Sequence, residues 1–449
     1  MESLSVELLL LIAEHVQVDQ RDYFRMLRVC RRWHAILSPK AYNRISLTHD
    51  QIQPLVRCIH NNPKLNIGAA IRDLDVWWAG GSDDECDVEL VNDAASRACD
   101  TPADRKRLGQ GLREGNPDAW FAILIQSLEA ITSLTIQYFH SEYSLPMLGR
   151  VANLDPPFNT VPALQHLERV TVRTEDLKTA YETADFLQLF RLPAMRMLEA
   201  NGLYEADDVD EIYPKPGPGT SGIKEIDLEG NGSKGMADYI TSCANLEVFN
   251  YQHDNKAVWG ELYLTFQPGA FYAALVTQKH SLRKLWLSDG GETDAEDCDD
   301  YDEEGNVHFN RFGSLTEFCQ LQELSIPVRT LLEFGHGDTP RVSLPDILPE
   351  SLEYLFLFDY LDEDFEVVSA NLKRVVEQRT KRFPNLTKLY LQPSKLEKIT
   401  LTHHWKFEIY ASVQQAFAPL MEICNRSGID FRLRKVAWAE DDDEDEDCL

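Results

Sequence analysis

Three short segments of the sequence carry residue types that bind nucleotides or metal ions in other proteins. Gly217, Gly219 and Gly222 have the spacing of a dinucleotide-binding fingerprint. That fingerprint needs a strand before it and a helix after it, because the helix N-terminus holds the phosphates. Here a proline-rich stretch precedes the glycines and a strand-like alternation follows them. The sequence therefore does not favour a nucleotide site in this segment.

The other two segments resemble parts of metal sites but lack key ligands. Residues 300–305 begin like a calcium-binding loop, yet the position that needs a bidentate glutamate is Arg311. His403 and His404 are adjacent, and no third ligand has a suitable spacing. The sequence also has no Gly-x-Ser-x-Gly elbow, no phosphate-binding loop and no His-Glu-x-x-His motif. We therefore expect a protein that is not an enzyme and has no catalytic residues, metal or cofactor.

The composition limits the classes of partner. The chain has 449 residues, of which 43% are hydrophobic, and a net charge of −30. This excess of negative charge disfavours binding to nucleic acid or to an anionic membrane. The first 50 residues differ, since they hold seven basic and six acidic residues. The nine cysteines form no Cys-x-x-Cys pair, which argues against a disulfide framework and fits a cytoplasmic or nuclear location.

A hydrophobic hexamer, apolar-x-x-apolar-x-apolar, recurs ten times along the chain. The ten copies begin at Ile71, Ile131, Leu167, Met195, Ile223, Leu246, Leu282, Leu321, Leu352 and Leu386. From residue 131 onward the steps are 36, 28, 28, 23, 36, 39, 31 and 34 residues. Such a period predicts a solenoid, in which each repeat adds one short strand and buries its apolar residues only by stacking on its neighbours.

The repeat resembles a degenerate leucine-rich repeat. The copy that begins at Ile223 is followed by Asn231, the asparagine of the leucine-rich repeat signature. The resemblance implies an α/β fold, with a curved parallel sheet and outer helices and loops. Helices are expected at 234–244, 363–382, 410–426 and from Pro268, and a closing strand at 429–433. Loop insertions are expected at about 79–117, 202–222 and 288–306.

Residues between the inward positions of each hexamer should lie on the open face of the sheet. The acidic ones near the centre of the chain are Glu199, Asp227 and Glu229, and the aromatic ones that follow are Trp286, Phe356, Phe358 and Tyr390. Exposed aromatic side chains are typical of interface hot spots. We therefore predict that a protein target binds near residues 285–392 and presents basic residues to the acidic strands. The alternative is that the acidic loop or tail covers these aromatics, or that they pack between neighbouring strands.

Residues 4–47 predict three short amphipathic helices. The run at 8–12 is apolar at five consecutive positions, so the first helix has apolar residues on every face. The second helix should begin at Asp19, a good N-cap, and the third should end before Pro39. Together they carry more apolar surface than fewer than fifty residues can bury in a core of their own. The excess predicts a docking surface.

The same stretch resembles an F-box. The matching positions are Leu4, Glu7, Leu8, Leu9, Ile12, Val29, Cys30, Arg31, Trp33, Pro39 and Tyr42, and Ser5 stands where the family usually has proline. The resemblance implies binding to a Skp-type adaptor and, through it, to a cullin–RING ubiquitin ligase. It also implies an adaptor interface made by Leu4, Ser5, Leu8 and Ile12, with Val16 and Leu27 nearby and Trp33 inside. The alternative is that these helices only cap the core of the following domain.

The expected organisation is an F-box at 1–48, a helical linker at 49–70, a leucine-rich-repeat domain at 71–438 and a disordered acidic tail at 439–449. On this interpretation the protein is the substrate-recognition subunit of an SCF-type E3 ubiquitin ligase, and its protein target is unknown. Two other classes remain open. One is a leucine-rich-repeat scaffold without ubiquitin transfer, and the other is an acidic inhibitor of a basic protein.

Overall fold

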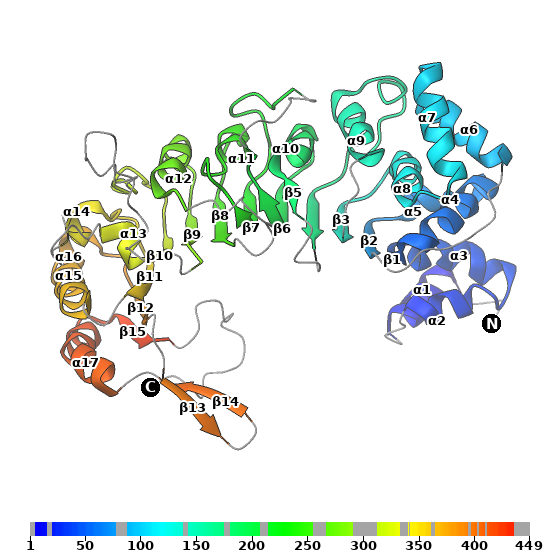
Figure 1. The fold of residues 1–449 in the computed structure, drawn as a ribbon. Helices are drawn as coiled ribbons and strands as arrows, with labels where there is room; N and C mark the ends of the chain where they lie inside the picture. Colours follow the sequence, from blue (N-terminus) through cyan, green and yellow to red (C-terminus); the bar gives the residue numbers. More distant parts are fainter. Residues whose placement is uncertain are drawn as a thin grey trace. The chain divides into compact units, whose positions relative to one another are not determined.

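The structure is a computed structural model in which the chain forms two compact units. The first consists of Met1–Asn201 with Asp208–Gly222, and the second of Gly202–Asp207 with Ile223–Leu449. The described residues are 5–15, 20–77, 88–137, 142–174, 180–206, 214–254, 266–290, 312–332, 340, 342–360, 364–393, 397–401, 404–408 and 411–434. Figure 1 labels the helices and strands of both units.

The first unit begins with three helices and continues with strands separated by helices. Its helices are α1 (Val6–His15), α2 (Gln20–Met26), α3 (Arg31–Ala41), α4 (Ile52–Asn61), α5 (Ile67–Ala70), α6 (Val88–Ala98), α7 (Pro102–Arg113), α8 (Pro117–Gln126), α9 (Ser144–Asn153) and α10 (Thr183–Phe186), with short 3-10 turns at His49–Gln51, Pro63–Leu65 and Leu187–Arg191. Its strands are β1 (Arg44–Thr48), β2 (Asp73–Trp77), β3 (Ser133–Gln137), β4 (Arg169–Arg173), β5 (Tyr181–Glu182) and the first part of β6 (Met197–Tyr204). Strands β1, β2, β3, β4 and β6 pair in this order, and every pair is parallel.

The register of these strands aligns the repeats. The fourth residues of successive hexamers face one another across the sheet, as Leu74, Leu134, Val170 and Leu198. All four side chains are buried. A parallel sheet stacks equivalent residues in rows, so each apolar side chain is covered by its counterparts on the neighbouring strands.

The second unit repeats the same arrangement over a longer run of strands. Its strands are β7 (Glu225–Asn231), β8 (Val248–His253), β9 (Lys284–Ser288), β10 (Glu323–Pro327), β11 (Tyr354–Tyr360), β12 (Lys388–Pro393) and β15 (Asp430–Leu433), and a separate hairpin is formed by β13 (Glu397–Leu401) and β14 (His404–Glu408). Its helices are α11 (Ala237–Ser242), α12 (Pro268–Leu275), α13 (Val328–Leu332), α14 (Leu344–Ile347), α15 (Phe365–Glu377), α16 (Arg379–Arg382) and α17 (Ala411–Arg426), with a 3-10 turn at Val276–Gln278.

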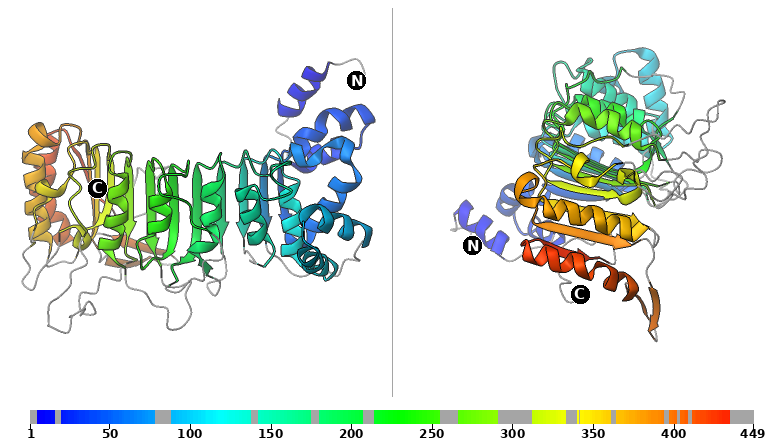
Figure 2. Two further views of the ribbon diagram at one scale, coloured as in Figure 1. Left: turned by 90° about the horizontal axis from the view of Figure 1, so that it is seen from above. Right: turned by 90° about the vertical axis from the view of Figure 1, so that its left-hand side faces the viewer.

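Strands β7 to β12 and then β15 pair in order and in parallel. Their inward row is Ile226, Phe249, Leu285, Leu324, Leu355, Leu389 and Phe431, and all seven side chains are buried. Within this unit α11, α12, α15 and α17 lie on one side of the sheet (Figures 1 and 2). The core of the unit therefore lies between the inward row and this layer of helices.

The repeat prediction is confirmed. Each of the ten hexamers lies on a strand, namely β2, β3, β4, β6, β7, β8, β9, β10, β11 and β12. The expected helices are α11, α12, α15 with α16, and α17, and the closing strand is β15. Strand β1 was not predicted, although Ile45 and Leu47 alternate with polar residues in the same way. The structure is thus an α/β fold with parallel strands, consistent with a leucine-rich repeat solenoid.

The loop expected at 79–117 is wrong for its larger part. Residues 88–113 form α6 and α7, and α8 begins at Pro117. Thr101 caps α7 by accepting the Asp104 N–H at 3.1 Å, and Asn116 caps α8 by accepting the Asp118 N–H at 2.9 Å. A capping side chain followed by proline starts a helix well, and this signal outweighs the Gly- and Ala-rich composition.

One helix boundary also differs from the expectation. The third helix does not end before Pro39 but continues to Ala41. Pro39 lies in the last turn, where its missing N–H removes a single hydrogen bond, and the Ser38 hydroxyl donates to the His34 carbonyl at 2.5 Å. Asp19, most of the 288–306 segment and the acidic tail lie outside the described residues, and the 202–222 segment includes the end of β6.

Candidate protein-binding surfaces

Helix α1 exposes several large apolar side chains. Val6, Leu8 and Leu11 are 43%, 48% and 50% exposed, whereas Leu9 on the inner side is 2% exposed. Ser5 begins the helix, because its hydroxyl accepts the Leu8 N–H at 3.3 Å. Leu8 and Leu11 lie three residues apart on one side of the helix, so together they indicate a surface that a partner can cover.

The inner sides of the three N-terminal helices pack together. Leu27, Leu37 and Ala41 form a buried cluster, and Trp33 packs against it as expected. Phe24 and Tyr42 add an edge-to-face contact at 5.4 Å between ring centroids. Leu27 is only 7% exposed. Its side chain therefore belongs to the core of these helices and is not available for direct contact with an adaptor.

The other predicted adaptor-binding residues divide into two groups. Ser5 and Leu8 are exposed on α1. Leu4 and Val16 lie outside the described residues, and so does the side chain of Ile12. The sequence reasoning missed Val6 and Leu11, and it used Val29, which is exposed in the turn before α3, only as part of the motif. Their hydrophobicity in a short helical segment was the available signal.

In the first unit, polar side chains form rows on the face of the sheet opposite the inward residues. The Trp77 indole N–H donates to the Asp75 carboxylate at 2.6 Å and lies 3.0 Å from the Ser46 hydroxyl. Glu199 accepts the Thr171 hydroxyl at 3.3 Å and lies 3.4 Å from an Arg173 nitrogen. The Glu199 carboxylate is therefore half-buried and already paired, so it is less available to bind a basic residue of a target.

In the second unit, β7 to β9 carry the predicted acidic residues and one aromatic residue. Asp227, Glu229 and Trp286 are all partly exposed. Asp227 lies opposite Asn250 in the register and accepts its side-chain N–H at 2.9 Å. The Lys284 ammonium lies 4.2 Å from the centre of the Trp286 ring, a cation–π contact that keeps the indole in place.

The aromatic residues of β11 and β12 are not exposed, contrary to expectation. Phe356, Phe358 and Tyr390 are 1%, 5% and 2% exposed and form a separate buried cluster against which Tyr354 packs. The ring centroids of Phe356 and Phe358 are 5.5 Å apart, and those of Tyr354 and Tyr390 are 5.1 Å apart. Parallel strands that are covered on both faces carry such nearly continuous apolar runs. These three residues are therefore packing residues in this structure.

Two arginines that sequence reasoning missed flank this cluster. Arg432 and Arg434 of the closing segment lie with their guanidinium carbons 5.6 and 5.0 Å from the centre of the Tyr390 ring. The Tyr390 hydroxyl donates to Asp430 at 3.1 Å. The register places Arg432 opposite Tyr390, but only a correct pairing of β12 with β15 could have predicted this contact.

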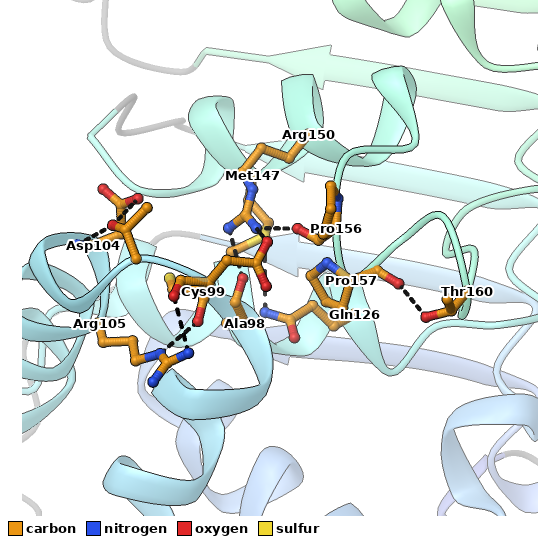
Figure 3. Close-up of polar contacts among 12 residues, drawn as sticks. Ala98, Cys99, Asp104, Arg105, Gln126, Met147, Arg150, Pro156, Pro157 and Thr160 are labelled. Carbon is orange, nitrogen blue, oxygen red and sulfur yellow. Dashed lines mark hydrogen bonds and ion pairs between the residues drawn. The ribbon is translucent and has the colours of Figure 1, made fainter.

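Polar clusters elsewhere in the first unit hold helix ends. In Figure 3, Arg150 donates to the carbonyl of Ala98 at 2.6 Å, and Arg105 donates to that of Cys99 at 2.7 Å. Both carbonyls lie at the C-terminal end of α6, where partial negative charge attracts cations. Arg150 also donates to the Pro156 carbonyl, and so it joins α6 and α9 to the turn that follows α9. Burial raises the pKa of the Cys99 thiol, which disfavours a reactive thiolate.

Three buried carboxylates also have structural partners. Asp118 accepts the Tyr143 N–H at 2.6 Å, and Asp364 lies 3.1 Å from the Arg329 Nε. Glu205 accepts a backbone N–H at 2.6 Å, while its burial raises its pKa. Hydrogen bonds to the main chain or to arginine are what buried carboxylates need, so these groups require no further function to explain them.

In the described part of the chain, no group of three or more His, Cys, Asp or Glu side chains is arranged to hold a metal ion. The candidate calcium loop at 300–305 and the side chains of His403 and His404 lie outside that part. None of the helices among the described residues combines the length and apolarity needed to cross a bilayer.

Comparison with known proteins identifies the repeat. A family profile described as a leucine-rich repeat domain matches residues 160–409, which is more than half of the chain. The match begins after the N-terminal helices and covers strands β4 to β14. No curated protein matches the chain. Leucine-rich repeats are protein-binding architectures, and their sheets and helices offer extended surfaces. Given this match and the stacked parallel strands, the chain belongs to the leucine-rich repeat family.

Proposed function

We propose that this protein is the substrate-recognition subunit of an SCF-type cullin–RING ubiquitin ligase. Helix α1 would bind a Skp-type adaptor, and the repeat domain would bind the protein target. The mechanism would be proximity, since the chain would hold the target near the ubiquitin-carrying enzyme.

The observation that carries the proposal is the exposed apolar surface of α1, where Leu8 and Leu11 lie on one side of the helix. Val6, Leu8 and Leu11 each leave about half of the side chain in water. Covering such a half contributes about 1 kcal/mol for each residue, so a partner that covers Leu8 and Leu11 together gains about 2 kcal/mol from α1 alone. The F-box pattern over the same helices supports an adaptor as that partner.

The target surface is revised by the burial of the β11 and β12 aromatics. The remaining candidates in the second unit are the partly exposed Asp227, Glu229 and Trp286 on β7 to β9. A target that brings basic side chains to the two carboxylates and an apolar group to the indole would fit this face. We therefore place target binding on β7 to β9.

Adaptor binding can be tested by co-purification with a recombinant Skp-type adaptor and its cullin. The variant Leu8→Asp/Leu11→Asp should lose the adaptor, because two charges would enter an apolar interface. The matched control is Val161→Asp, which also places a charge on an exposed apolar side chain of the first unit. Equal adaptor recovery from all three forms would refute the F-box assignment.

Ubiquitin transfer needs a separate measurement. Proteins captured by the wild-type chain should have longer half-lives in cells that carry only the Leu8→Asp/Leu11→Asp variant. If the wild-type chain recovers the adaptor but the half-lives of the captured proteins are the same in both kinds of cell, the scaffold without ubiquitin transfer would be favoured instead. An acidic inhibitor of a basic protein would bind its partner without any adaptor, so the co-purification also separates that class.

The target surface can be tested with Asp227→Lys/Glu229→Lys and Trp286→Ala. Each should reduce target capture without affecting adaptor recovery. Glu422→Lys on α17 is the control, since it also reverses an acidic charge, on the helical side of the same unit. If target capture is unchanged in both test variants, the β7 to β9 face is not the binding surface.

A further inference from the structure

A cavity of about 530 Å³ opens on the helical side of the second unit, between α14 and α15. Its lining combines apolar and charged side chains. The ones that matter here are Val342, Ile347, Val367 and Ala370, which are apolar, and Asp346 and Arg374, which are charged. Cavities of this size hold small ligands or the anchoring side chain of a peptide.

The α15 side of the cavity is a single helical face. Val367, Ala370 and Arg374 are spaced three and four residues apart, so they follow one another along that face. Ala370 and Arg374 are exposed and Val367 is half-buried. The next turns of α15, with Leu372, Val375 and Val376, point into the core. The helix is therefore anchored from behind, and its cavity face is available for a ligand.

The charge beside this cavity is opposite to that of the chain. Residues 373–382 contain five basic residues and one acidic residue, in a protein with a net charge of −30. Lys373 pairs with Glu377 at 3.9 Å, and Arg382 pairs with Asp346 of the cavity at 3.7 Å. Among the residues that the structure describes, no carboxylate pairs with Arg374 or Lys381. In the described part of the chain, Arg374 is thus an exposed cation on the cavity lining with no carboxylate partner.

We propose that this cavity binds an acidic peptide segment of a partner protein. One apolar side chain of the peptide enters between Val342, Ile347 and Ala370, and a carboxylate beside it pairs with Arg374. Arginine suits this role, because its planar guanidinium can bind a carboxylate through two hydrogen bonds. Basic peptides are repelled by the same cation, and the net charge of the chain disfavours nucleic acid. The surface is distinct from α1 and from the β7 to β9 face.

The test uses the full-length protein and a fluorescent twelve-residue peptide with one leucine among aspartates and glutamates, measured by fluorescence anisotropy at low salt. Ala370→Trp fills the cavity without changing charge, and Arg374→Glu reverses the charge at its edge. We expect each to weaken peptide binding about tenfold or more, the equivalent of about 1.4 kcal/mol. A peptide with serine in place of leucine should be weakened similarly, and added salt should weaken all binding.

Lys373→Glu is the matched control, because it makes the same charge change one residue away on a side chain that does not line the cavity. It should weaken binding less than about threefold, since exposed charges outside the contact contribute little. Equal losses in Arg374→Glu and Lys373→Glu, full binding by Ala370→Trp, or no saturable binding by the wild type would overturn the proposal. Binding that appears only when residues 440–447 are changed to their uncharged amides would also overturn it, because the chain's own acidic run would then be the occupant.

Discussion

The buried aromatic cluster on β11 and β12 leads to a prediction that separates two interpretations of one residue. If Phe356 were an exposed binding residue, Phe356→Ala would reduce target binding and leave stability almost unchanged, within about 0.5 kcal/mol. In the structure the side chain is 1% exposed and packs against Phe358 and the neighbouring tyrosines. We therefore expect the substitution to destabilise the second unit.

The magnitude follows from the burial. Replacing a fully buried phenylalanine by alanine loses the transfer free energy of the ring and leaves a cavity, which together cost about 3–5 kcal/mol. The adjacent Leu355 provides an internal standard, because it is 0% exposed on the opposite face of the same strand. Leu355→Ala should cost about 2–5 kcal/mol by the same mechanism. The two substitutions should therefore have comparable effects.

Urea unfolding followed by circular dichroism measures both effects. The shift in the transition midpoint multiplied by the slope gives the change in unfolding free energy. Because Leu355 and Phe356 are neighbours on one strand, both substitutions report on unfolding of the same part of the solenoid, and their midpoint shifts can be compared directly. If Leu355→Ala shifts the midpoint strongly and Phe356→Ala leaves it near the wild-type value, the burial of Phe356 in the cluster with Phe358 and Tyr390 would be refuted.

Further predictions concern backbone space, a buried ion pair and pH. Gly235→Ala should cost about 3–4 kcal/mol, since the glycine has a φ of 69° and an added Cβ would lie 2.4 Å from the α12 backbone. Gly428→Ala, with a φ of 68° and nothing within 4 Å, should cost only about 1–2 kcal/mol, and equal midpoint shifts would contradict the close approach. Arg329→Met should lower the unfolding free energy by about 3 kcal/mol, because it leaves a buried carboxylate without its guanidinium, and a neutral result in urea unfolding would argue against this pair. Burial and the neighbouring Glu182 raise the pKa of Asp185 from 3.8 to about 6. The folded state therefore binds the Asp185 proton more tightly than the unfolded state does. As a result, the free energy of unfolding falls as pH rises from about 4 to about 6. Asp185→Asn should make this decrease in the free energy of unfolding smaller by about 1–2 kcal/mol, as measured by unfolding at several pH values across that range. An unchanged pH profile would exclude the raised pKa of Asp185.

Local sequence signals explain most of what was predicted correctly. The hexamer placed all ten strands because its apolar residues must alternate with outward residues and must stack on equivalent neighbours. Pro268 marked the start of α12 because its fixed φ and missing N–H suit the first position of a helix. Composition alone predicts a loop at 79–117, whereas the caps at Thr101 and Asn116, which are visible in the sequence, indicate the helices α7 and α8.

The outward residues were harder to predict. Asp227 and Phe356 occupy equivalent positions in their hexamers, and the register places both on the same face of the sheet. One is partly exposed and the other is buried. Nothing in the period distinguishes them, because the period reports only which face a side chain points to. Whether that face is covered depends on segments that are distant in the sequence.

The sequence by itself therefore determined the repeat, the parallel order of its strands, the inward rows and the apolar excess of the N-terminal helices, since all of these follow from short-range spacing. The tertiary structure decided which apolar residues stay exposed, and it separated Leu8 on the surface of α1 from Leu27 in the helical core. It also brought Asp346 of α14 and Arg374 of α15 to one cavity, although they are 28 residues apart. The burial of a side chain and its contacts with residues distant in the sequence depend on how the helices and strands pack. The local spacing of residues does not determine this packing.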